Sequence, residues 1–238
     1  IIPTYNEAKN IELLTDKIFE SGKEFSILII DDNSPDGTWQ KVLSLQKKYP
    51  NLRLIKREQK KGLGSAYRLA FREVLKGDYD IILQMDADLS HDPAYIAPML
   101  QLMKNYDVVI GSRYIRGGGV FDWSFNRLLL SRIANVFSRI VLRVPVYDIT
   151  SGFKCMRRKV LEDIIFDRIS SRGYFFQIET TFYSYKKGFR LTELPIVFSG
   201  RRKDISKMSL GIILEGLWKI LFLSFSSFFS VFHKSSDG

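Results

Sequence analysis

The amino-acid sequence predicts an α/β protein in which helices flank a mostly parallel sheet. Up to about residue 111, apolar runs typical of buried strands alternate with segments that have the periodicity of helices. Each apolar run ends in polar or turn-forming residues. Strands and helices that alternate in this way form right-handed crossovers and a parallel sheet with helices on both faces.

The expected elements follow one another in regular order. We expect strands at Ile1–Ile2, Phe25–Ile30, Leu52–Ile55, Tyr79–Met85 and Asp107–Ile110. We expect helices at Ile11–Phe19, Thr38–Lys48, Ser65–Leu75 and Ala94–Met103. Further on we expect a flexible loop at Gly117–Gly119, a basic amphipathic helix at Asn126–Leu142, and a mixture of short strands and an aromatic-rich helix at 150–200.

The last part of the chain differs from the rest in composition. Leu210–Phe232 is apolar apart from a narrow polar stripe, and it carries only two charged residues, Glu215 and Lys219. About 20 apolar residues cross a bilayer, so the segment is long enough to span one, and it is equally suited to lie in the interface. We therefore divide the chain into an α/β domain at 1–209, a membrane-associated amphipathic or apolar helix at 210–232 and a tail at 233–238.

Composition narrows the classes of partner. The chain has 238 residues, 45% of them hydrophobic, and a net charge of +10 that favours nucleotides, acidic lipids or nucleic acid. We find no known nucleic-acid-binding module, so nucleic acid ranks last of these. Cys155 is the one cysteine, which excludes an internal disulfide and fits a reducing compartment, and no Cys/His cluster has the spacing of a zinc site.

Acidic residues gather at the ends of the expected strands. Asp86-Ala87-Asp88 follows one strand, Asp31-Asp32 ends a second, and Pro3-Thr4-Tyr5-Asn6-Glu7 follows a third. The carboxyl ends of parallel strands meet at one edge of the sheet, where ligands bind. Carboxylates crowded there would repel each other without a cation, and Mg²⁺ and Mn²⁺ prefer such oxygen ligands. Taken alone, Asp86-Ala87-Asp88 is equally compatible with a solvated turn that caps the helix at Pro93.

Three further features have simpler interpretations. Lys61-Gly62-Leu63-Gly64 lacks the spacing of a Walker A loop, and we expect a tight turn before a helix. Asp36-Gly37-Thr38 is typical of a turn followed by a helix cap. For His91 we expect a local loop or cap role, not that of a base or a metal ligand.

Taken in order, these motifs resemble those of one enzyme family. The motifs are Pro3-Thr4-Tyr5-Asn6-Glu7, Asp31-Asp32-Asn33-Ser34-Pro35-Asp36-Gly37-Thr38, Lys61-Gly62-Leu63-Gly64, Asp86-Ala87-Asp88-Leu89-Ser90-His91 and Gly111-Ser112-Arg113-Tyr114. They are similar to the ordered motifs of dolichyl-phosphate mannosyltransferases, which are GT-A enzymes of glycosyltransferase family 2. Ser206-Lys207-Met208 also matches, so the resemblance extends to about residue 210. Several motifs in one order are far more specific than any one of them.

The resemblance implies a role for each matching position. The nucleotide-sugar site would comprise Pro3, Tyr5, Glu7, Ile30, Asp32, Asp86, Ala87, Asp88, Arg113, Arg201 and Lys207. Asp86, Asp88 and Arg113 would be catalytic, and Asp86, Asp88 and Ser90 would hold Mg²⁺ or Mn²⁺. Arg127 and Ser131 would meet the acceptor phosphate. The sequence departs from the family at residues 201–206, where Asp-Ile-Ser replaces the usual Gly-Glu-Ser before the lysine, so the matching arginine is Arg201 or Arg202.

The resemblance also implies a reaction. The expected enzyme is an inverting glycosyltransferase of GT-A (Rossmann-like) fold that moves mannose from GDP-mannose to dolichyl or another polyprenyl phosphate. It would work at a membrane surface, with the catalytic domain at 1–209 on the cytoplasmic side. One alternative is a relative that uses UDP-glucose or another nucleotide-sugar. Another is a non-catalytic nucleotide-binding subunit, against which both Asp86 and Asp88 are present.

Overall fold

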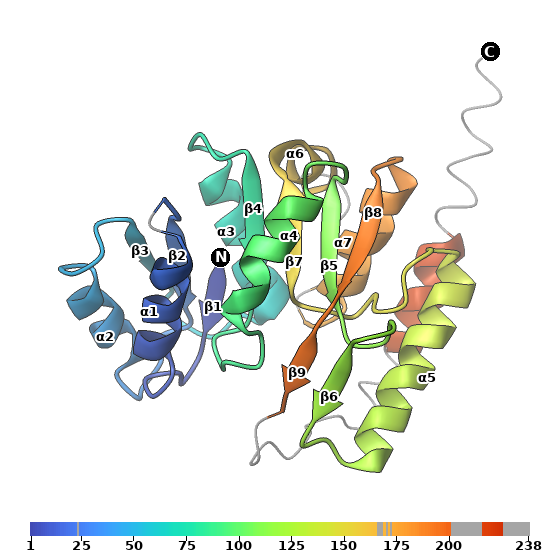
Figure 1. Cartoon of the computed structure of the whole chain (residues 1–238), viewed down its shortest axis with the longest axis horizontal. Helices are drawn as coiled ribbons and strands as arrows, with labels where there is room; N and C mark the ends of the chain where they lie inside the picture. Colours follow the sequence, from blue (N-terminus) through green and yellow to red (C-terminus); the bar gives the residue numbers. More distant parts are fainter. Residues whose placement is uncertain (23, 166–168, 170, 172, 201–215, 226–238) are drawn as a thin grey trace.

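The computed structural model describes residues 1–22, 24–165, 169, 171, 173–200 and 216–225 (Figure 1). Its strands are β1 (Ile2–Thr4), β2 (Ile27–Asp31), β3 (Leu52–Lys56), β4 (Ile81–Gln84), β5 (Val108–Ser112), β6 (Gly119–Phe121), β7 (Lys154–Arg157), β8 (Leu191–Pro195) and β9 (Val197–Ser199). Its helices are α1 (Ile11–Ser21), α2 (Thr38–Leu45), α3 (Leu63–Val74), the short 3₁₀ helix η1 (Pro93–Tyr95), α4 (Ile96–Leu102), α5 (Phe125–Leu142), α6 (Arg158–Ile165) and α7 (Phe176–Lys186).

The main sheet is mostly parallel, as predicted. One part has the order β1-β2-β3 and is parallel throughout, and the other has the order β4-β7-β5-β8. Two backbone hydrogen bonds, from Ile1 N to Leu83 O (2.7 Å) and from Met85 N to Ile1 O (3.2 Å), join the two parts at β1 and β4. Only β7 runs antiparallel to its neighbours β4 and β5 among these described strands. The strands that the sequence predicted before residue 111 therefore share one layer.

Helices cover both faces of this layer, which accounts for the apolar runs in the central strands. β2 and β5 are buried at every position, as expected of parallel strands that are covered on both sides. One core cluster holds apolar side chains of α3, α6 and α7, and the other holds those of α1, α2 and α4. Figure 1 shows α1 and α4 in front of the sheet and α3 and α7 behind it.

The region after residue 150 is richer in structure than predicted. The sequence indicated a single aromatic-rich helix among short strands, whereas the structure has two helices, α6 and α7, separated from each other in the chain. The antiparallel strand β7 inserts between β4 and β5, with Gln84 opposite Lys154 and Leu83 opposite Cys155. Gly119, expected in a loop, begins the short strand β6, which pairs with β9.

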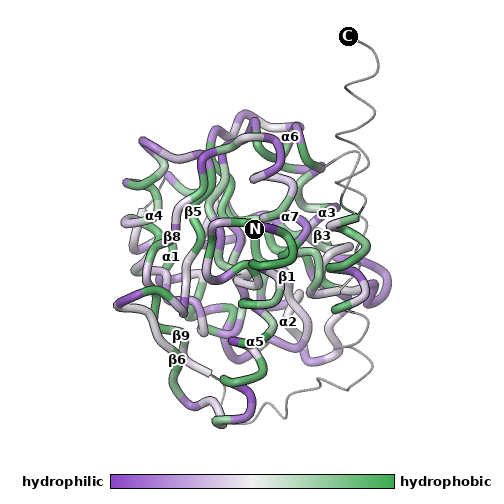
Figure 2. The backbone as a smooth tube through the Cα atoms, turned by 90° about the vertical axis from the view of Figure 1, so that its right-hand side faces the viewer, coloured by the Kyte–Doolittle hydropathy of each residue, from purple (hydrophilic) through white to green (hydrophobic). Residues whose placement is uncertain are grey.

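The long helix α5 turns polar as well as apolar side chains inward. Its buried residues are Asn135, Ser138 and Leu142. Its exposed large apolar residues are Phe125, Leu129, Ile133, Val136 and Ile140. The predicted helix is therefore present. Phe137, Val141 and Leu142 pack on the core, and the row of exposed apolar residues faces away from it. Figure 2 shows the hydropathy along the chain from the side on which α5 lies.

The C-terminal segment contributes a helix at 216–225. Its Ile220 and Leu223 belong to the core cluster of α3 and α7, and Ser224 Oγ donates to Val141 O of α5 at 3.2 Å. Trp218, Leu221, Phe222 and Phe225 are exposed. Within the described residues, no helix is both long enough and apolar enough to cross a membrane. The remainder of the predicted helix at 210–232 lies outside the described residues.

Candidate active site

The polar ends of the parallel strands meet at one edge of the sheet, as predicted. His91 is buried there, and its charge state is influenced by Asp86, Asp88, Arg113 and Asp148. Asp86 also acts electrostatically on Tyr67 and Arg113. These interactions place the loop after β4 and the loop after β5 within electrostatic range of each other.

The loops after β1 and β2 are joined by hydrogen bonds to side chains. Asn6 N donates to Ser34 Oγ at 3.0 Å, Glu7 N donates to Thr38 Oγ1 at 2.9 Å, and Ala8 N donates to Asp36 Oδ2 at 3.0 Å. Asp36 also accepts from Thr38 N at 3.1 Å, which confirms the predicted turn, whereas the N-cap position of α2 is Gly37, which makes no side-chain cap hydrogen bond. These bonds fix the shape of the expected nucleotide pocket.

The members of that pocket lie side by side. Pro3 pairs with Ile30 in the register of β1 and β2. Tyr5 is exposed, and Lys60 Nζ lies 3.8 Å from the centroid of its ring. Glu7 and Asp32 are buried at the ends of their strands. The arrangement leaves one aromatic ring open to a ligand, with a cation above it.

Arg57 is a site residue that the sequence reasoning missed. Its guanidinium forms a buried ion pair with Asp32, and Nη1 donates to Ser65 Oγ at 2.8 Å. Nη2 also reaches Gly62 O at 3.4 Å. Arg57 therefore connects Asp32, the carboxylate expected to bind the base or ribose, to the turn that precedes α3. The signal in the sequence is its place directly after the strand Leu52–Lys56, at the same edge as the carboxylates.

His91 and Ser90 form hydrogen bonds with the loop Asp86–Asp88. Asp86 N donates to His91 Nδ1 at 3.0 Å. Burial lowers the pKa of His91, against the opposing effect of Asp86 and Asp88, so the ring stays neutral and keeps Nδ1 as an acceptor. Ser90 N donates to Asp88 Oδ1 at 3.0 Å, and the Ser90 hydroxyl donates to the same oxygen. His91 thus has the local supporting role that the sequence predicted.

The carboxylates of Asp86 and Asp88 suit a hard divalent cation. A single residue, Ala87, separates them in the loop after β4, and the Asp86 side chain is 38% exposed. No group of three or more His, Cys, Asp or Glu residues that suits a metal occurs in the described residues. A cation there would therefore take two protein carboxylates and complete its shell with phosphate oxygens and water, as Mg²⁺ and Mn²⁺ commonly do. Ser90, the third predicted ligand, lies beside them, and its hydroxyl and backbone N donate to Asp88 Oδ1.

Arg113 lies in a buried ion pair with Asp148. Nε donates to Asp148 Oδ2 and Nη2 donates to Oδ1, both at 2.7 Å. Burial acts to lower the pKa of Arg113. The negative charges of Asp148 and, more weakly, of Asp86 act in the opposite direction, and the net effect raises the pKa. Arg113 is therefore permanently charged, although Asp148 compensates much of that charge. The sequence reasoning missed Asp148, whose only signal is its place in the polar run Asp148-Ile149-Thr150-Ser151.

The expected acceptor residues lie on the inward side of α5. The guanidinium of Arg127 lies 4.1 Å from the ring centroid of Trp123. Ser131 Oγ accepts a hydrogen bond from Tyr114 OH at 2.6 Å. Tyr114 follows Arg113 directly, so the expected acceptor and donor residues are neighbours. Arg201, Arg202 and Lys207 lie outside the described residues.

Comparison with known proteins relates the chain to a family of enzymes. A family model described as glycosyl transferase family 2 matches residues 1–165. Polyprenol monophosphomannose synthase of Mycolicibacterium smegmatis is 40% identical over 222 residues, which cover 92% of this chain and 84% of that protein. Undecaprenyl-phosphate mannosyltransferase of Micrococcus luteus is 38% identical over 217 residues, which cover 91% of this chain and 89% of that protein.

Solved structures share the fold at much lower sequence identity. Glucosyl-3-phosphoglycerate synthase from Mycobacterium tuberculosis, in complex with UDP, has a TM-score of 0.64 and 18% identity, over 92% of this chain and 78% of that one. Mannosyltransferase PcManGT from Pyrobaculum calidifontis, in complex with GDP-Man and Mn²⁺, has a TM-score of 0.57 and 18% identity, over 86% of this chain and 56% of that one. These likenesses support a GT-A-like α/β fold.

Proposed function

The chain belongs to glycosyl transferase family 2, and from that premise we propose that it transfers mannose from GDP-mannose to a polyprenyl phosphate with inversion at the anomeric carbon. The observation that carries the proposal is the 40% identity to a polyprenol monophosphomannose synthase over 92% of the chain. An undecaprenyl-phosphate mannosyltransferase matches over a similar range. The site adds paired carboxylates, arginines and a neighbouring helix with a free apolar side.

On the donor side, the chain's own residues hold the nucleotide and the leaving diphosphate. Tyr5, Glu7 and Asp32 border the pocket for the base and ribose, and Arg57 keeps Asp32 in place. Asp86 and Asp88 would hold Mg²⁺ or Mn²⁺, which neutralises charge that develops on the diphosphate. Arg113 adds a preorganised positive charge close to Asp86.

On the acceptor side, Arg127 and Ser131 would donate to the lipid phosphate through charge-assisted hydrogen bonds. Ser131 Oγ accepts from Tyr114 OH, so the proton of Ser131 is directed to another acceptor. A phosphate monoester has a second pKa of about 6, so its oxygen is already a nucleophile near neutral pH. The reaction needs no strong base, which agrees with the use of His91 Nδ1 to support Asp86.

We also place the enzyme at the cytoplasmic surface of a membrane. The exposed apolar row of α5 gives it a side suited to lipid, and Arg132 and Arg143 lie beside that row. The net charge of +10 favours an anionic leaflet, where each nearby Lys or Arg adds about 1 kcal/mol. The single buried Cys155 fits a reducing compartment.

A panel of labelled nucleotide-sugars tests the proposal. The purified full chain is incubated with polyprenyl phosphate and Mn²⁺, and with GDP-mannose, UDP-glucose or GDP-glucose as the donor. We expect label in the lipid fraction from GDP-mannose alone, and none when the lipid is left out. Transfer from UDP-glucose but not from GDP-mannose would replace the donor in this proposal, and no transfer from any donor would reject it.

A further inference from the structure

Three residues on one side of α5 contact the loops that flank this helix in the chain, before its start and after its end. They are Arg127, Ser131 and Asn135, which are four positions apart and so lie one above the other on the helix. Arg127 stacks on Trp123, whose ring centroid also lies 5.4 Å from the guanidinium of Arg113. Ser131 accepts from Tyr114. The expected acceptor helix is thus joined to Arg113 and Tyr114 over three successive turns.

The deepest of these contacts is made by Asn135. It is 2% exposed in the middle of a helix, where asparagine has a poor intrinsic preference. Its Nδ2 donates to Thr150 Oγ1 at 3.0 Å, and its Oδ1 accepts from Thr150 N at 3.2 Å. This reciprocal pair fixes the distance between α5 and the loop that carries Thr150. A buried amide that is satisfied on both ends holds its partner in one orientation.

Thr150 continues the connection to the donor side. Its Oγ1 accepts from Arg113 Nη2 at 2.9 Å and donates to Asp148 Oδ1 at 3.2 Å. One hydroxyl group therefore contacts Asn135 on α5 and both members of the Arg113–Asp148 ion pair. Loss of that hydroxyl would remove one hydrogen bond from Asn135 Nδ2 and one from Arg113 Nη2.

We propose that Asn135 and Thr150 are positioning residues that hold the acceptor helix α5 in register with the donor-side arginine Arg113. The proposal rests on the proposed function, because it takes Arg113 and Arg127 to meet the two substrate anions. In this proposal, Asn135 and Thr150 act through Arg113 and α5 and have no substrate contact of their own. They set the distance between the two anion sites, and a misplacement of about 1 Å can cost about 100-fold in rate.

Kinetics of four variants test this role. Thr150→Val and Asn135→Leu remove the connection, Thr150→Ser keeps the hydroxyl, and Ser138→Ala is the control. Ser138 is buried one turn further along α5, and its hydroxyl donates to Ala134 O within the same helix at 2.7 Å. We expect Thr150→Val and Asn135→Leu to lower kcat at least about tenfold while the KM for GDP-mannose stays within about twofold. Thr150→Ser and Ser138→Ala should stay within about twofold of the wild type.

The double variant Asn135→Leu/Thr150→Val separates a shared connection from two independent effects. If both residues act through one contact, the double variant is no slower than the slower single variant. Losses that multiply would overturn the proposal, and so would a Thr150→Ser enzyme as slow as Thr150→Val.

Hydrogen exchange provides a second readout that needs no acceptor and no turnover. We expect GDP with Mn²⁺, or UDP with Mn²⁺, to slow amide exchange along α5 in the wild type and in Ser138→Ala, and to lose this effect in Thr150→Val. Equal protection of α5 in Thr150→Val, or none in the wild type, would overturn the coupling. If no donor in the panel supports transfer, the proposed reaction is rejected. The coupling between α5 and Arg113 is then still decided by hydrogen exchange, which does not depend on transfer.

Discussion

At the scale of single residues, Asp88 and Asp92 lie in the same loop but have different surroundings. Asp88 accepts from the backbone and the hydroxyl of Ser90 and lies two positions after Asp86. Asp92 caps the 3₁₀ helix η1, where its Oδ1 accepts from Ala94 N at 2.9 Å. Asparagine retains a side-chain oxygen for such a cap but lacks the charge that a cation requires.

This difference predicts opposite outcomes for two conservative variants. Asp88→Asn should lower kcat at least about 100-fold and weaken the dependence on divalent cation, because one of two charged ligands is lost. Asp92→Asn should keep activity within about twofold, because asparagine also caps helices. Rates are measured over a Mn²⁺ titration with both variants. Full wild-type activity in excess EDTA would remove the metal from the mechanism.

His91 gives a second prediction at this scale. Its ring stacks on Phe153 at 4.9 Å between centroids and meets Phe198 edge-on at 5.4 Å. His91→Phe should keep this packing but leave Asp86 N without its acceptor, which costs about 1–3 kcal/mol. We expect a lower Tm and a higher Mn²⁺ concentration for half-maximal activity. An unchanged Mn²⁺ requirement would show that the bond to Asp86 N does not position the carboxylate.

The sequence predicted the strand-end carboxylates but not their partners. Asp86, Asp88 and Asp32 could be chosen because they follow apolar runs, and polar strand ends converge in a parallel sheet. The ion pairs Arg57–Asp32 and Arg113–Asp148 join residues 25 and 35 positions apart. No local pattern encodes such pairs, since they depend on how the loops pack once the sheet has formed.

At the scale of elements, β7 is one of the strands whose place the sequence did not predict. Lys-Cys-Met-Arg is short and begins with a charged residue, yet Lys154 is fully buried between β4 and α7. Its Nζ donates to Gln177 O at 2.6 Å and to Gln177 Oε1 at 3.1 Å. Hydrophobic periodicity identifies strands by their apolar residues, so a strand that begins with a buried lysine is not recognised by it.

Lys154 also makes stability depend on pH. Burial lowers the pKa of Lys154 from 10.5 to about 7, against a smaller opposing effect of Asp148. Between these values the unfolded chain holds a proton that the folded chain lacks. The free energy of unfolding therefore rises with pH in this window, by at most about 1.4 kcal/mol per pH unit.

Lys154→Met isolates this contribution from all other titrations. Urea unfolding of both proteins is measured at intervals from about pH 7 to about pH 10. The difference in free energy of unfolding should shift in favour of the wild type as pH rises, because methionine binds no proton in either state. A difference that stays constant with pH would show that Lys154 keeps its proton in the folded protein.

The orientation of α5 is the other feature that the sequence left open at this scale. The helix itself was predicted within one residue of its start, at Phe125 instead of Asn126. Its apolar residues occupy more than one side, and periodicity alone does not say which of these sides faces the core. Asn135 and Ser138 turn inward because Thr150 and the backbone of α5 satisfy their side chains.

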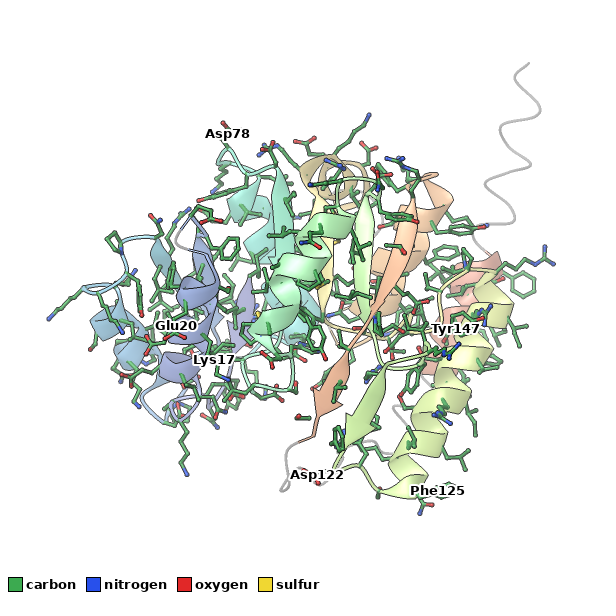
Figure 3. All side chains as sticks on the ribbon, in the orientation of Figure 1. Lys17, Glu20, Asp78, Asp122, Phe125 and Tyr147 are labelled. Atoms are coloured by element: carbon green, nitrogen blue, oxygen red, sulfur yellow. The ribbon has the colours of Figure 1, made fainter. Side chains whose placement is uncertain are left out.

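At the scale of the whole molecule, many of the exposed large apolar residues lie on α5 and on the helix at 216–225. α5 and the helix at 216–225 lie at one end in Figure 1, and α2 lies at the other. Phe125 projects from the outer end of α5, as labelled in Figure 3. Exposed apolar patches of this kind mark contacts with a membrane or another protein. The lipid-linked acceptor of the proposed reaction favours the membrane.

Substitutions on α5 test this contact without disturbing the core. Truncation before residue 210 would also remove Ile220 and Leu223, which are buried, so it would not distinguish binding from folding. Ile133 is 56% and Ile140 69% exposed, and both lie on the outer side of α5. Leu43 on α2 is 47% exposed at the far end and serves as the matched control.

We expect Ile133→Glu/Ile140→Glu to lose at least about tenfold in binding to anionic liposomes, because two apolar side chains are removed from lipid and two negative charges are added. Leu43→Glu should bind as the wild type does. The double variant should also turn over long-chain polyprenyl phosphate in liposomes poorly, yet keep its rate on a short-chain acceptor in solution, since Arg127 and Ser131 remain on the inner side of the helix. Equal sedimentation of the double variant and Leu43→Glu would show that α5 does not contact the membrane, and a matching loss on the short-chain acceptor would show that the substitutions disturb the acceptor site itself.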